Sequence, residues 1–264
     1  MGHTAPITQQ QLKSARVDFK ADKFDILVEQ KGLKLTHQYS VKCSCIREVN
    51  GSALPNCEIC EGIGFTFNGS HILKGIIQAI NFNPKFQQYS EVNLGTALLT
   101  TRYTDRLGWY DKIIVDDGAT MFSENIFPII RGTGITQKCS GLLTYVPIDF
   151  LQPLGSNVTM KAFLYVNTTT QTELTYNTDY TFTGREMILS NALRDALIAS
   201  GKDKYYIGVR YKHKPEYIVM DIQKNIRNSL VLNVGGGEEL RHLPIHCTIK
   251  KTHYLLNGQG ITPP

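Results

Sequence analysis

The sequence lacks any apolar run long enough to cross a bilayer, which argues against a membrane-spanning helix. It also lacks a charged and apolar leader of the kind that directs secretion, so we expect the chain to work in a reducing compartment. Of its 264 residues, 42% are hydrophobic and 19% charged, which is typical of a globular protein with a sizeable core.

The motifs of the common enzyme classes are missing as well. Gly235–Gly237 is followed by no P-loop lysine and has no dinucleotide-binding spacing. Of the seven histidines, His242 and His246 have HxxxH spacing, but the residues between them are Leu-Pro-Ile and include no glutamate of an HExxH motif. No serine lies in a nucleophile elbow. We therefore expect a protein that is not an enzyme.

What the chain does have is a compact group of cysteines. Four of the six fall within eighteen residues, as a CxC pair and a CxxC pair separated by eleven residues. They are Cys43, Cys45, Cys57 and Cys60. Two short pairs closed by a small loop supply the four soft ligands that Zn²⁺ prefers, so the spacing predicts a structural zinc site.

Other uses of these cysteines are a redox CxxC motif, disulfides, or ordinary buried thiols. A redox motif needs a helix directly after it, whereas Gly62 and Gly64 follow here. Disulfides need an oxidising compartment. A catalytic zinc leaves one ligand position open, whereas four cysteines close the site. Cys139 and Cys247 are isolated in the sequence, and we interpret them as unpaired thiols.

Hydrophobic periodicity divides the first half into an arm and a β-rich domain. Residues 1–21 are polar, and we expect a flexible arm that orders only against a partner. Within the domain at 22–131, a short helix ends at Gly32 and a strand leads from Leu33 into the cysteines. Short strands with Gly, Asn-Pro and Asp-Gly punctuation then predict a compact β-barrel or sandwich.

The second half has the pattern of another β-domain. Residues 132–140 resemble a linker, and residues 141–264 are rich in Thr, Val, Ile and Tyr. We expect a second antiparallel β-sandwich there, with one short helix at 191–200. The predicted fold is therefore mainly β: a zinc knuckle and barrel followed by a sandwich, with few short helices.

The net charge of +5 lies entirely in the segment from Gly201 onward, where ten Lys or Arg residues oppose five acids. Tyr205 to Lys214 alternates aromatic and basic residues, which suits either stacking of single-stranded nucleic acid or a half-buried strand with one wet face. Composition alone does not distinguish a nucleic-acid-binding strand from an ordinary half-buried strand. A zinc-stabilised nucleic-acid-binding protein is therefore the alternative function.

Several stretches together resemble neck proteins of tailed bacteriophages, of the head-closure or stopper-like kind. In that family a small zinc knuckle leads into a β-barrel. The stretches are the cysteine cluster with Gly62-Ile-Gly64-Phe65, Gly75–Ile80, Gly95–Thr100, Leu107–Ile114, Phe122–Glu124, Asn177–Tyr180, Val209–Val219 and Leu243–Ile245. Trp109-Tyr110 departs from the pattern, which more often has a glycine before the aspartate.

The resemblance implies a structural virion protein without enzymatic activity. Such a protein forms a homo-oligomeric ring, six- or twelve-fold, between the portal or adaptor proteins and the tail proteins. Packaged DNA passes through the ring without sequence-specific contact, and no membrane is involved. The resemblance also implies a Cys₄ zinc knuckle, location in the virion neck and assembly in the host cytoplasm.

Overall fold

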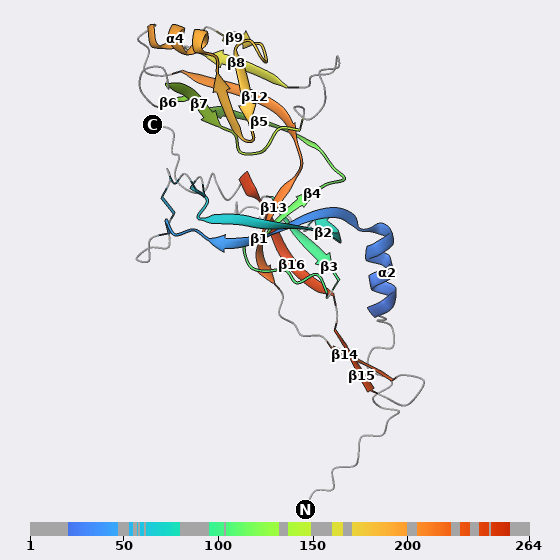
Figure 1. The fold of residues 1–264 in the computed structure, drawn as a ribbon. Helices are drawn as coiled ribbons and strands as arrows, with labels where there is room; N and C mark the ends of the chain where they lie inside the picture. Colours follow the sequence, from blue (N-terminus) through green and yellow to red (C-terminus); the bar gives the residue numbers. More distant parts are fainter. Residues whose placement is uncertain are drawn as a thin grey trace, which may run out of the picture. The chain divides into compact units, whose positions relative to one another are not determined.

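Figure 1 shows the computed structural model, in which strands predominate. It describes residues 21–46, 53–54, 57, 59–60, 62–79, 95–102, 104–131, 137–148, 160–165, 171–199, 205–222, 228–232, 238–242 and 244–253. The sheets are antiparallel wherever the register is defined, and the described residues contain two helices. The mainly-β prediction is confirmed. The expected arm falls almost wholly outside the described residues, as does most of the linker.

The chain forms two compact units, and neither is continuous in sequence. Unit 1 comprises Met1–Lys112 and Ile218–Lys250, and unit 2 comprises Ile113–Tyr217 and Lys251–Pro264. This division differs from the sequential one predicted, with domains at 22–131 and 141–264. The difference arises because two strands of the C-terminal part pair with the N-terminal part, whereas residues 120–131 belong with the second half.

Six strands form a closed barrel, most of whose residues belong to unit 1. In order they are β1 (Leu33–Lys42), β2 (Phe65–Ala79), β3 (Thr96–Thr101), β16 (Ile245–Lys251), β13 (Glu216–Ile222) and β4 (Lys112–Val115). The boundaries between the two units fall within β4, β13 and β16. Alternate residues point inward, and Leu35, Leu99, Val219 and Ile249 are fully buried. A Cβ at Gly75 would lie 2.8 Å from Cδ1 of Leu99 and 2.9 Å from Cδ1 of Leu35, so a larger residue there would displace these buried side chains.

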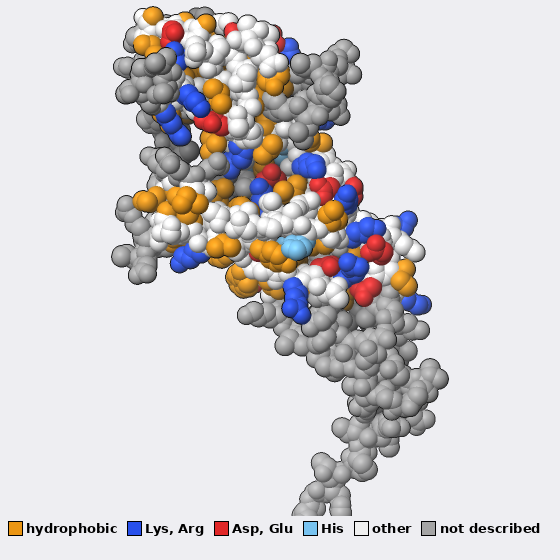
Figure 2. Space-filling model, in the orientation of Figure 1, with side chains coloured by type: hydrophobic (Ala, Val, Ile, Leu, Met, Phe, Trp, Pro, Cys, Tyr) orange, Lys and Arg blue, Asp and Glu red, His pale blue; other side chains and the backbone are white. Residues whose placement is uncertain are grey.

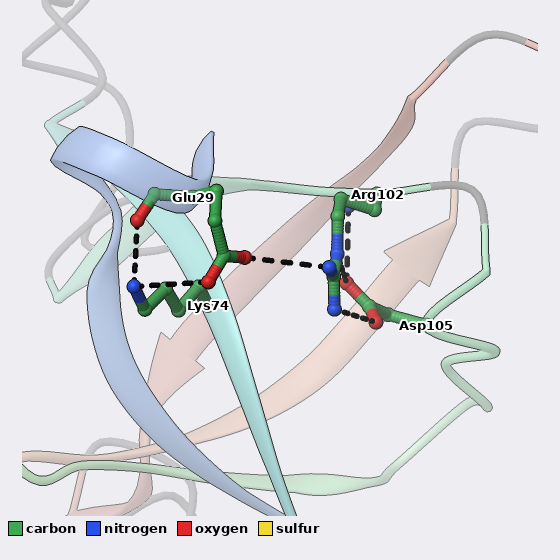
Figure 3. Close-up of polar contacts among 4 residues, drawn as sticks. All are labelled: Glu29, Lys74, Arg102 and Asp105. Carbon is green, nitrogen blue, oxygen red and sulfur yellow. Dashed lines mark hydrogen bonds and ion pairs between the residues drawn. The ribbon is translucent and has the colours of Figure 1, made fainter. Parts of the chain in front are cut away.

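The helix α2 (Ala21–Lys31) is attached to the barrel by one buried residue and a group of exposed ion pairs. Val28 is fully buried, and its carbonyl accepts a hydrogen bond of 2.8 Å from Gly32 N where the helix ends. Lys74 lies 3.1 Å from Glu29, which also contacts Arg102 at 3.3 Å (Figure 3). Figure 2 shows basic and acidic side chains interspersed over this surface.

Unit 1 also holds the two-stranded ribbon of β14 (Asn228–Leu232) and β15 (Glu238–His242), which pair antiparallel.

Unit 2 is built from two four-stranded sheets. One has the order β10 (Tyr180–Thr183), β11 (Glu186–Leu189), β7 (Lys138–Leu142), β6 (Ile129–Arg131). The other has the order β5 (Thr120–Ile126), β12 (Tyr206–His213), β8 (Lys161–Tyr165), β9 (Gln171–Leu174). Buried side chains from both sheets and from α4 (Asn191–Ala199) form one hydrophobic cluster, which is the arrangement expected of a sandwich.

Tyrosine and histidine rings cross the core of unit 2. Tyr145 stacks on His213 with ring centroids 3.8 Å apart, and its hydroxyl lies 2.6 Å from Nδ1 of His253. The hydroxyl of Tyr211 donates to Glu124 at 2.5 Å and accepts from the backbone N–H of Tyr145. These polar groups are therefore satisfied although they lie inside the core.

Candidate metal centre

The four clustered cysteines lie where the β1–β2 hairpin turns back on itself. Cys43 directly follows β1, and its backbone N–H donates to the carbonyl of Gly64 at 2.9 Å, just before β2 begins. Gly62 and Gly64 have positive φ angles of 83° and 87°, which L side chains rarely adopt. A Cβ at Gly64 would also approach Ile46 to 3.2 Å. The glycines therefore let the chain turn tightly beneath the sulfur atoms.

The structure brings all four predicted ligands together. Their Sγ atoms all lie within 4.8 Å of one another. Sγ of Cys43 lies 3.8 Å from that of Cys57, and Sγ of Cys45 lies 3.3 Å from that of Cys60. Sulfurs placed tetrahedrally about 2.3 Å from a zinc ion are about 3.8 Å apart, so the cluster is compatible with zinc. All four thiols are free, because disulfide sulfurs would lie about 2.05 Å apart.

Backbone donors also prepare the cluster for a cation. The N–H of Gly64 donates to Sγ of Cys60 at 3.3 Å. Backbone N–H groups of Cys60 and Ile59 lower the pKa of Cys57 to about 7, because they stabilise its thiolate. A backbone N–H of Leu54 acts in the same direction on Cys45. There, desolvation and hydrogen bonds with the other thiols outweigh it and raise the pKa to about 12.

Without a metal, the thiols therefore differ in how readily they lose a proton. A bound cation would replace the protons that remain. Among the described residues, this is the one group of three or more His, Cys, Asp or Glu side chains with the geometry to hold a metal ion.

Beside the cysteines, aromatic residues connect the hairpin to the barrel. Phe65 stacks on Tyr110 with ring centroids 4.6 Å apart. Tyr110 has a φ of 65°, a strained conformation for a bulky residue, and its N–H donates to the carbonyl of Val219 at 2.8 Å. The departure from glycine before Asp111 therefore falls at a position whose backbone geometry favours glycine.

A buried carboxylate fixes this loop. Asp111 accepts hydrogen bonds from Nε2 of His37 at 2.7 Å, Ser40 N at 2.9 Å and Gly108 N at 2.6 Å. His37 and Asp111 are each 3% exposed. Desolvation alone would raise the pKa of Asp111, but the hydrogen bonds together hold it below its usual value.

Sequence reasoning missed the pairing of His37 with Asp111. The two residues are 74 positions apart, and no local pattern links them. The available signal was the alternation of β1, which places His37 on the same inward face as Leu35.

No family model matches the chain, and no curated protein matches it. None of the described helices is both long and apolar enough to span a membrane.

Proposed function

We propose that the chain is a structural protein of a tailed-phage neck, with one Zn²⁺ held by Cys43, Cys45, Cys57 and Cys60. In this role it forms a six- or twelve-fold homo-oligomeric ring between the portal or adaptor proteins and the tail, around the DNA channel. It has no catalytic role and acts in the virion after assembly in the host cytoplasm.

One observation supports the proposal most. A hairpin carries four converging cysteines at its turn and leads directly into a closed β-barrel. This is the combination that the resemblance to neck proteins implies. The cysteines leave no open ligand position, so the metal would stabilise the hairpin rather than bind a substrate.

The arrangement of unit 1 suits a structural component of a ring. Metal binding and folding are coupled in small cysteine-rich modules of this kind. The barrel closes its sheet and leaves no free edge among its six strands, which limits uncontrolled strand pairing between copies. A ring of such copies would then need specific side-chain contacts.

Antibody labelling of tailed particles tests the proposal. Antibodies raised against unit 2 should mark the head–tail junction of particles purified from cultures that carry this gene. Native mass spectrometry of the purified chain should find six or twelve copies with one zinc per copy. Intact tailed particles without label at the junction would overturn the neck assignment, and zinc-free protein with titratable thiols would overturn the metal assignment.

A further inference from the structure

The outer face of the β5-β12-β8-β9 sheet in unit 2 combines aromatic rings and cations on neighbouring strands. The burial of β12 alternates strictly: Ile207, Val209 and Tyr211 point into the core, so Tyr206, Gly208, Arg210 and Lys212 lie on the opposite face. The segment from Tyr205 to Lys214 is thus a half-buried strand, as one sequence interpretation held. The composition of its outer face remains to be explained.

The strands beside β12 place similar residues next to it. Tyr206 is registered with Tyr165 of β8, Gly208 with Phe163, and Arg210 with Lys161. On the other side, Gly208 faces Asn125 of β5, Arg210 faces Ser123, and Lys212 faces Met121. We define the outer face as the solvent-facing positions of four strands and the residue after β5. They are Tyr206, Gly208, Arg210 and Lys212 of β12, Lys161, Phe163 and Tyr165 of β8, Met121, Ser123 and Asn125 of β5, Gln171 and Glu173 of β9, and Phe127.

The rings on the outer face form one connected group. Tyr165 and Tyr206 stack with centroids 5.1 Å apart and an interplanar angle of 19°, and Phe127 lies 6.1 Å from Tyr206. Phe127 is 59% exposed. A Cβ at Gly208 would lie 2.8 Å from the ring of Tyr165, so the missing side chain lets that ring lean across the strand. The aromatic surface consequently spans neighbouring strands without interruption.

The charge of the outer face is positive. Arg210, Lys212 and Lys161 supply three cations, and the one described acid on this face, Glu173, lies 2.5 Å from Lys161. Arg210 is exposed, and Ser123 and Asn125 beside it are exposed hydrogen-bonding groups. A solvent-exposed sheet face needs polar residues but does not need stacked aromatic rings. Exposure to solvent alone therefore does not account for the rings on the outer face.

We propose that this outer face binds single-stranded nucleic acid. Bases stack on Tyr206, Tyr165 and Phe127, because every base offers a π-face to such rings. Arg210 and Lys212 contact the phosphates, and Ser123 and Asn125 offer hydrogen bonds without strong sequence preference. This binding site is independent of the ring and the neck location proposed above.

Fluorescence anisotropy of the full-length protein with labelled dT₂₀ and rU₂₀ tests this site. At physiological salt we expect dissociation constants of roughly 1–100 µM, which rise with salt at a log–log slope of about +1.4 for two phosphate contacts. Comparing the two oligonucleotides distinguishes DNA from RNA. Weak binding of a 20-base-pair duplex is expected because its bases are already stacked.

Variants separate the stacking from the charge. Tyr206→Ala should weaken binding by about 5- to 150-fold with little change in salt slope. Arg210→Ala should reduce the slope by about 0.7. Gly208→Ala should also weaken binding, because it displaces the ring of Tyr165 without removing a ring or a charge. Each variant is compared with wild type by its unfolding midpoint.

Matched controls lie elsewhere on the surface. Arg131→Ala removes an exposed cation from the other sheet of unit 2, and Trp109→Ala removes an exposed aromatic from unit 1; neither should alter binding. No binding of either strand in low salt would overturn the proposal. Full binding by Tyr206→Ala, loss in Trp109→Ala, or preference for duplex or for a poly-glutamate peptide would overturn it too. None of these results would bear on labelling at the head–tail junction.

Discussion

The two units stabilise their buried polar groups in different ways. In unit 1, Asp111 has a lowered pKa because hydrogen bonds from His37, Ser40 and Gly108 outweigh its desolvation. In unit 2, burial lowers the pKa values of His213 and His253, which favours neutral rings. The buried carboxylate of unit 1 is thus stabilised in its ionised form, whereas the two histidine rings of unit 2 are stabilised in their neutral form.

Because of this difference, an experiment can destabilise one unit without the other. A chelator or the loss of a carboxylate should act on unit 1, and mild acid should act first on unit 2. Hydrogen exchange read by mass spectrometry distinguishes them, because peptides of β3 and β16 report on the barrel and peptides of β12 and β8 report on the sandwich.

The largest expected effect follows loss of a metal ligand. Cys57→Ser should lower the zinc content from about one equivalent to near zero and open the hairpin turn to proteolysis, because metal binding and local folding are coupled. Elemental analysis and cleavage mapping measure the two outcomes. Cys139→Ala, a cysteine outside the cluster, should keep its zinc. Equal zinc in wild type and Cys57→Ser would contradict the assignment.

The second largest effect is expected on the stability of unit 1 when the buried charge of Asp111 is removed. Asp111→Asn should lower the free energy of unfolding of unit 1 by about 3 kcal/mol, because one partner of a buried hydrogen-bonded pair is removed. Denaturant titration followed by exchange in β3 and β16 measures it. Asp221→Asn, at an exposed acid of β13 in unit 1, should change stability by less than about 0.5 kcal/mol. A similar loss in both variants would refute the role of Asp111.

Mild acid should weaken unit 2 before the barrel. The pKa of His253 is lowered to about 4, whereas an unfolded histidine titrates near 6.5. Between these values the unfolded chain binds a proton that the folded unit does not, so stability falls as pH decreases from about 6.5 to about 4. His213 acts in the same direction.

The contribution of Asp111 is retained until the pH falls through the ordinary aspartate range near 3.9, because its folded pKa lies lower. Exchange in β12 and β8 should therefore accelerate at pH 5 while β3 and β16 stay protected. His253→Gln removes one titrating ring and should make the pH dependence of unit 2 shallower. If exchange protection were lost at the same pH in both units, the proposed difference between their buried polar groups would be contradicted.

The smallest effect is expected at the ion pairs beside α2. Glu29→Gln should cost less than about 1 kcal/mol, because the pairs with Lys74 and Arg102 are well exposed to water. The cost should disappear near 1 M salt, where such pairs are screened. Thermal unfolding at low and high salt measures it. A salt-independent cost above about 2 kcal/mol would show that α2 packing depends on Glu29.

Local patterns predicted much of the fold. The helix ending at Gly32, the strand from Leu33 and the helix near Asn191 are all present, because capping and periodicity act over a few residues. The clustering of the four cysteines also followed from spacing, since short pairs across a tight turn have few other ways to lie.

The partners of distant strands were not predictable in this way. Alternation identifies β16 as a strand and marks its inward residues, but it does not say that Cys247 pairs with Leu99. Likewise, Glu124 was assigned to the first domain, yet it accepts a hydrogen bond from Tyr211 in unit 2. Both contacts depend on tertiary packing rather than on neighbouring residues, so local patterns do not identify them.

The pairing of β3 with β16 has a consequence for biosynthesis. The ribosome completes β3 at Thr101 and does not reach its partner until Ile245. At 5–20 residues per second, the intervening stretch takes roughly 7 to 30 seconds to translate. During that interval one edge of β3 has no native neighbour, and such edges pair readily with other chains. Nascent chains on one messenger are therefore most exposed to mutual strand exchange before their last segment emerges.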